Sequence, residues 1–75
     1  MKKKIIVELF DNEYFIKLPY KKNTGDLQCN KLTNAMRYLG IVIDNEEDEF
    51  IIKSSTEIEN KCYGKGIRIE FISTK

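Results

Sequence analysis

The densest group of ionisable side chains in this 75-residue chain is acidic. Five carboxylates fall within six consecutive positions, and they belong to Asp44, Glu46, Glu47, Asp48 and Glu49. At the tip of a hairpin, such a cluster can dock on a basic protein surface, because complementary charge speeds and orients association. It can also be a solvated turn that discourages pairing at a sheet edge. We expect a protein-binding site here, with a larger protein that has a basic surface as the partner.

A second group interleaves basic residues with tyrosines. Its members are Tyr20, Lys21, Lys22, Arg37, Tyr63 and Lys65. If these side chains share one face, they can hold phosphates and stack a base, as proteins that bind single-stranded nucleic acid do. The other reading is scattered surface lysines with tyrosine rings packed sideways. This group supports the alternative function, a small nucleic-acid-binding module or transcriptional regulator.

Catalytic and metal-binding chemistry finds little support in the residue types. The chain contains no histidine, which excludes a Ser/His or Cys/His nucleophile system. Asp44, Glu46 and Asp48 alternate as the ligands of a calcium loop do, but Glu49 stands where that loop needs glycine. We therefore expect no enzyme, no cofactor, no metal site and no small-molecule substrate.

The cysteines and the first residues bear on the compartment. Cys29 and Cys62 are far apart and form no Cys-x-x-Cys pair, so neither a zinc site nor a framework of disulfides is indicated. The lysines at 2–4 resemble the start of a secretory signal, but Glu8 interrupts the apolar run that follows. No apolar stretch approaches the ~20 residues that span a bilayer. We expect a soluble cytoplasmic protein with reduced thiols and no membrane partner.

The pattern of apolar residues predicts the elements that hold these groups. Period-two alternation predicts strands at residues 4–10, 14–18 and 66–73, and β-branched runs predict strands at 41–43 and 50–52. The segment between residues 44 and 49 is then a hairpin turn. A Ser-x-x-Glu spacing at 54–57 predicts a short helical turn.

One main helix is predicted from a 3.6-residue period. Leu32, Ala35, Met36 and Leu39 form its apolar stripe, and Cys29 lies one turn earlier. Either Thr24 or Asp26 is expected to cap its start, and Gly40 is expected to end it. We expect Leu32, Met36 and Leu39 to be buried against the sheet, in particular against Val7, Ile16, Ile43 and Ile69.

These elements predict one domain over residues 1–75 with an α+β fold. Its sheet has four to five strands in the order β-β-α-β-β-β, antiparallel or mixed, and the main helix packs on one face. The expected function is that of a non-enzymatic small binding protein, an accessory or inhibitor that acts through protein–protein contact. Phages and other mobile genetic elements often encode proteins of this kind.

Reduced thiols make a simple prediction about stability. If Cys29 only fills an apolar position, adding a reductant leaves the melting temperature unchanged, because there is no disulfide to break. Thermal unfolding with and without dithiothreitol checks this. A clear fall on reduction would establish a bridge between Cys29 and Cys62 and would favour an extracellular protein.

Overall fold

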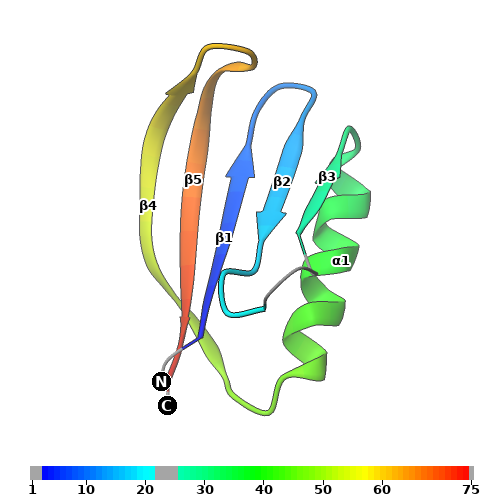
Figure 1. Ribbon diagram of the computed structural model, residues 1–75, viewed down its shortest axis with the longest axis vertical. Coiled ribbons are helices and arrows are strands. Elements are labelled where there is room, and N and C mark those ends of the chain that lie inside the picture. Colours follow the sequence, from blue (N-terminus) through cyan, green and yellow to red (C-terminus); the bar gives the residue numbers. More distant parts are fainter. Residues whose placement is uncertain (1–2, 22–25, 75) are drawn as a thin grey trace.

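The computed structural model describes residues 3–21 and 26–74. It contains one five-stranded sheet, all of whose pairings are antiparallel, and one helix (Figure 1). The elements in chain order are β1 (Lys4–Leu9), β2 (Tyr14–Lys17), β3 (Leu27–Cys29), α1 (Leu32–Asn45), β4 (Phe50–Asn60) and β5 (Gly64–Ser73). The predicted α+β class is confirmed. The order along the chain is β-β-β-α-β-β and not the predicted β-β-α-β-β-β. The short strand β3 precedes the helix, and two strands follow it where three were predicted.

The strands lie in the spatial order β3-β2-β1-β5-β4, which places β1 in the centre of the sheet. Val7 of β1 is opposite Ile16 on one side and opposite Ile69 on the other. Val7 and Ile16 are almost completely buried, and Ile69 packs against the same core. The side of the sheet that carries these residues is the side on which α1 lies, because Ala35, Leu39 and Val42 of α1 belong to the same core.

Helix α1 is displaced toward the C-terminus relative to the predicted helix. Its buried residues are Ala35, Leu39 and Val42, with the i, i+4, i+7 spacing of one helix face. Gly40 lies inside α1 and does not end it, and residues 41–43 are helical where a strand was predicted. A glycine inside a helix costs only about 1 kcal/mol, so the burial of Val42 is enough to carry the helix past it.

The start of α1 also differs from the prediction. Cys29 belongs to β3, and α1 begins after Lys31, whose side chain makes no capping hydrogen bond. Asp26 does not cap the helix. Its Oδ1 accepts a hydrogen bond of 2.9 Å from the backbone N–H of Leu18, which joins the two ends of the loop between β2 and β3. Thr24 lies outside the described residues.

A long hairpin of β4 and β5 completes the sheet. Residues 54–57, predicted as a helical turn, are extended within β4 and pair with β5, for example Glu57 with Ile67. At the tip, Asn60 Oδ1 accepts hydrogen bonds from the backbone N–H groups of Cys62 and Tyr63. Gly64 follows with φ of 83°, a conformation that favours glycine. Pairing with β5 gives the backbone N–H and C=O groups of β4 hydrogen-bond partners over many residues. This outweighs the Ser-x-x-Glu capping signal at 54–57.

Burial along α1 is uneven. Leu39 is 7% exposed, as predicted, but Leu32 and Met36 are 47% and 53% exposed, contrary to the prediction. The reason is the position of α1, which packs on β2 and β3, the two strands at one edge of the sheet (Figure 1). Part of the apolar surface of the helix therefore has no strand beneath it.

This unevenness predicts unequal effects of alanine substitution. Leu39→Ala should lower the free energy of unfolding by about 2–5 kcal/mol, because it leaves a cavity in the core. Met36→Ala is the matched control on the same helix, and its effect should stay below about 1 kcal/mol because the side chain is half exposed. Urea unfolding of both variants measures the difference. Equal losses would show that α1 does not pack through Leu39.

Candidate functional site

The five clustered acids lie where α1 leads into β4. Asp44 is in the last turn of α1, Glu46 is the residue that follows the helix, and the others belong to the connection to β4. The segment is therefore not a hairpin tip, because residues 41–43 are helical. Asp44, Glu47 and Glu49 are exposed to solvent.

Two of these acids hold the fold together. Lys3 Nζ lies 2.6 Å from Glu46 Oε2, and the Tyr20 hydroxyl donates a hydrogen bond of 3.0 Å to Glu46 Oε1. Lys3 Nζ also lies 4.0 Å from Asp48 Oδ2. The side chains of Glu46 and Asp48 are only 12% and 16% exposed. Glu46 thus joins the end of α1 to the segment before β1 and to the loop after β2, and it is not available to an external partner.

The same contacts change the titration of the three groups. The hydrogen bond from Lys3 is the main cause that lowers the pKa of Glu46, and the reciprocal bond raises the pKa of Lys3. Burial, followed by the hydrogen bond to Glu46, raises the pKa of Tyr20 to about 12. The contacts therefore favour a charged Lys3, a charged Glu46 and a neutral Tyr20, which is the combination that the ion pair and the hydrogen bond require. We interpret this network as one that stabilises the fold.

The basic and aromatic residues are not gathered on one face. Tyr20 and Lys21 lie in the loop after β2, whereas Tyr63 and Lys65 lie at the tip of the β4–β5 hairpin, at the opposite end of the sheet (Figure 1). Arg37 is exposed in the middle of α1. Lys22 lies outside the described residues. The described members of this group therefore form no continuous surface for a nucleic acid.

Tyr63 has a packing role on the face of the sheet that is turned away from α1. Its ring centroid lies 5.5 Å from that of Phe10 and 5.2 Å from that of Phe15. Phe10 covers Gly66, where an added Cβ would lie 2.5 Å from both the Phe10 ring and the Leu9 carbonyl oxygen. Gly66 is needed for this close approach. The ring of Tyr63 thus supports the hairpin, as the alternative reading of sideways packing predicted.

A different surface emerges on the helix side of the sheet, over β5 and β4. Ile67 of β5 and Ile52 of β4 are 45% and 62% exposed. Ile67 is opposite Leu9 and Ile52 is opposite Phe71, and both of these neighbours pack against the core. Residues directly opposite in a ladder point to the same face. Ile52 and Ile67 therefore lie on the helix side, in a region that α1 does not cover.

The exposed side of α1 borders the same region. Leu32, Met36 and Ile43 form a stripe beside Leu39 at helical spacing. Strands β3 and β4 run parallel, and crossovers between parallel strands are right-handed in nearly all proteins. In a right-handed crossover from β3 to β4 with α1 packed on β2 and β3, the side of α1 that carries Leu32, Met36 and Ile43 faces β5. We call the exposed surface formed by Leu32, Met36, Ile52 and Ile67 the uncovered strip.

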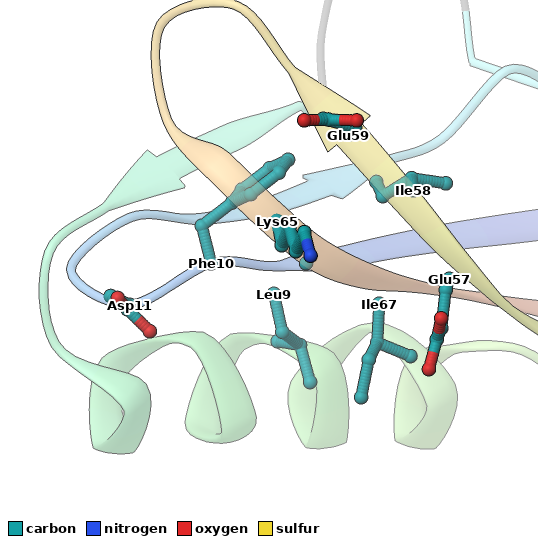
Figure 2. A pocket seen from close by; sticks show the side chains of 9 residues that line it. Leu9, Phe10, Asp11, Glu57, Ile58, Glu59, Lys65 and Ile67 are labelled. Carbon is teal, nitrogen blue, oxygen red and sulfur yellow. The ribbon is translucent and has the colours of Figure 1, made fainter.

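An acidic hollow lies at the hairpin end of the uncovered strip. Its volume is about 660 Å³, and the residues around it are Leu9, Phe10, Asp11, Glu57, Ile58, Glu59, Lys65, Gly66 and Ile67. Leu9, Ile67 and Glu57 point toward the side on which α1 lies (Figure 2). Three carboxylates against one lysine make the hollow negative, while Leu9 and Ile67 supply apolar surface. It suits a group with an apolar body and a positive charge.

The sequence contained one signal for this hollow, the spacing of Glu57 and Glu59 on alternate residues. The helical turn predicted at 54–57 would hide this signal, because side chains two residues apart diverge in a helix. In β4 they are alternate residues of one strand face, with Glu57 opposite Ile67 and Glu59 opposite Lys65 of β5. Strand pairing, which joins distant parts of the chain, creates the hollow.

Among residues 3–21 and 26–74, no three His, Cys, Asp or Glu side chains are grouped so as to hold a metal ion. Over the same residues, α1 lacks the length and apolar character of a membrane-spanning helix.

The Glu46 network predicts a pH-dependent part of the stability. The pKa of Glu46 is lowered below its ordinary 4.5, so its contribution is present above that pH and is lost as the pH falls further. Glu46→Gln should therefore be less stable than the wild type at pH 7, and the gap should shrink under acid. Urea unfolding from pH 7 to pH 3 measures it. Glu47→Gln, at the exposed neighbouring position, is the control, and a gap of the same size at both pH values would contradict the role of the charge.

A scan against protein-family models, a search of curated proteins and a search of solved structures each found no match. The function is accordingly inferred from the contacts, exposure and charges of this chain.

Proposed function

We propose that this chain is a non-enzymatic binding protein that acts as an accessory or inhibitor by covering a surface of a larger protein. The observation that carries the proposal is the uncovered strip. Leu32, Met36, Ile52 and Ile67 leave roughly half of their side-chain surface in water on one side of the sheet. Burial of apolar surface is the main favourable term in protein association, so a partner that covers the strip is stabilised by it.

The opposite face of the sheet offers no comparable strip. Its centre is crossed by ion pairs between neighbouring strands, with Lys4 Nζ 3.2 Å from Glu70 and Lys17 Nζ 3.1 Å from Glu8. Ile6 lies opposite Lys17 of β2 and Glu70 of β5 and is 9% exposed, although the described helix lies on the other face of the sheet. On this opposite face Ile51, at 54% exposed, is the one exposed large aliphatic side chain among the described residues, so the larger exposed apolar surface lies on the helix side.

The proposed contact surface differs from the acidic segment that the sequence indicated. Glu46 and Asp48 are engaged within the fold, so the binding charge is carried by Glu57, Glu59 and Asp11 around the hollow. A partner with a basic surface therefore remains part of the proposal. Cytoplasmic action also remains part of it, because both cysteines are free thiols and the cytosol keeps thiols reduced.

Nucleic-acid binding receives less support. Tyr20 is hydrogen-bonded to Glu46 and Tyr63 is packed against two rings, so neither presents a free face beside a continuous row of lysines. The acids of the hollow would repel phosphates. Binding of nucleic acid is therefore treated as a contrary outcome of the test.

The test compares two pairs of isoleucines with similar exposure. Ile52→Ser with Ile67→Ser removes apolar surface from the strip, whereas Ile51→Ser with Ile41→Ser removes it elsewhere, from side chains that are 54% and 51% exposed. Affinity capture from the source cells, quantified by mass spectrometry, should lose the partner protein only with the first pair. Since each lost isoleucine contact weakens binding by about tenfold, the double variant should bind about 100-fold more weakly.

Circular dichroism should show that both double variants stay folded. Equal capture by the two would remove the strip from the proposal. Capture that depends on nucleic acid and disappears after nuclease treatment would favour the alternative function.

A further inference from the structure

We infer that the uncovered strip receives a basic amphipathic helix of the partner, which lies beside α1 and completes the helical layer. The inference rests on the proposed function and specifies the element that the partner contributes. Its grounds are the dimensions of the strip, the charge around it and the properties of the edge strand.

The dimensions match a single helix. Helix α1 packs on β2 and β3. Although Phe50, Ile69 and Phe71 also pack against the core, Ile52 and Ile67 stay exposed, so the region without a covering helix lies over β5 and β4. Strands are spaced about 4.8 Å apart, so this region is about 10 Å wide, which is the diameter of a helix. Its length is that of the β4–β5 hairpin, whose strands have 11 and 10 residues. At about 3.3 Å per residue this accommodates roughly six helical turns.

The charge selects a basic helix. Asp11, Glu57 and Glu59 surround the hollow at the hairpin end of the strip, and Lys65 is the one basic residue that lines it. Lysine and arginine can lay their aliphatic stems on apolar surface such as Leu9 and Ile67 while their charged ends reach carboxylates. A helix with an apolar stripe flanked by such residues therefore matches both the apolar surface of Leu9 and Ile67 and the carboxylates that surround it.

The edge strand argues against an added strand as the occupant. Within the described residues β4 pairs only with β5, so its outer edge is open. The pairing is interrupted by a register shift between Ile52 and Ser54, and the rest of the edge bears Glu57 and Glu59. Bulges and charges of this kind oppose the addition of another strand.

A second copy of the chain is also a poor occupant. The apolar stripes of α1 already face the sheet and the strip, and on its outward side Ile41 is the one exposed large apolar residue. Placing the strip of one copy on that of another would bring their Glu57 and Glu59 carboxylates together. Neither arrangement supplies an apolar stripe flanked by positive charge.

The test uses three synthetic peptides of about five turns, or ~18 residues each. The first has leucines at i, i+4, i+7 and i+11 with lysines elsewhere, the second has the same pattern with glutamates for the lysines, and the third is a scrambled version of the first. Binding is measured by fluorescence anisotropy at several salt concentrations. Only the patterned basic peptide should bind, and its affinity should fall as salt rises because exposed charges are screened.

Variants of the full chain locate the contact. Ile52→Ser should weaken binding of the patterned basic peptide by about tenfold, and Ile67→Ser by a similar factor, because each removes an apolar contact. Ile51→Ser is the matched control on the opposite face of β4 and should change the affinity by less than about twofold. Glu57→Gln with Glu59→Gln should weaken binding and flatten its dependence on salt.

Three results would overturn the inference. They are equal binding of the patterned and scrambled peptides, equal effects of the Ile51 and Ile52 variants, and a dimer in sedimentation experiments that Ile52→Ser abolishes. If the peptides fail while the strip variants lose the native partner, the proposed function stands and the helical occupant is wrong. If capture of the native partner is unaffected by the strip variants, the proposed function itself falls, whatever the peptides do.

Discussion

Among the described residues, a single helix of 14 residues covers a sheet of five strands, and the rest of the structure follows from that mismatch. One helix is about two strands wide, so it can seal only part of one face. Helix α1 seals the part over β2 and β3, and the core forms there with β1. On the other face, ion pairs and three packed aromatic rings replace a helix. The helix side of β5 and β4 receives neither solution.

The position of α1 is fixed at its C-terminal end. Glu46 accepts hydrogen bonds from the Lys3 ammonium and the Tyr20 hydroxyl, which belong to segments on either side of the β1–β2 hairpin. These contacts hold the end of the helix against the β1–β2–β3 half of the sheet. The acidic segment, the most conspicuous feature of the sequence, thus takes part in the fold, because Glu46 joins the end of α1 to the segments before β1 and after β2.

The sequence predicted the features that depend on local pattern. Period-two alternation located β1, β2 and β5, and the helical period identified Ala35 and Leu39 as core residues. It failed for residues 41–43, where β-branched side chains favour a strand locally but Val42 continues the buried face of α1. It also failed for the exposure of Met36 and for the hollow. Both depend on which strands α1 covers, and that is decided by the pairing of β1 with β5, at the two ends of the chain, which no local pattern reveals.

The pairing of β1 with β5 also has a kinetic consequence. The backbone N–H of Lys3 donates to Ser73 Oγ, and the N–H of Ser73 donates to the Lys3 carbonyl oxygen, each at 2.9 Å. The β1–β2 and β4–β5 hairpins each close a loop of a few residues and can form early. Pairing of β1 with β5 closes a loop of almost the entire chain. Loop entropy makes such a step slow. Until it occurs, β1 and β5 each have an open edge lined with isoleucine, so the nascent protein is most prone to aggregation in the interval between forming its hairpins and joining them.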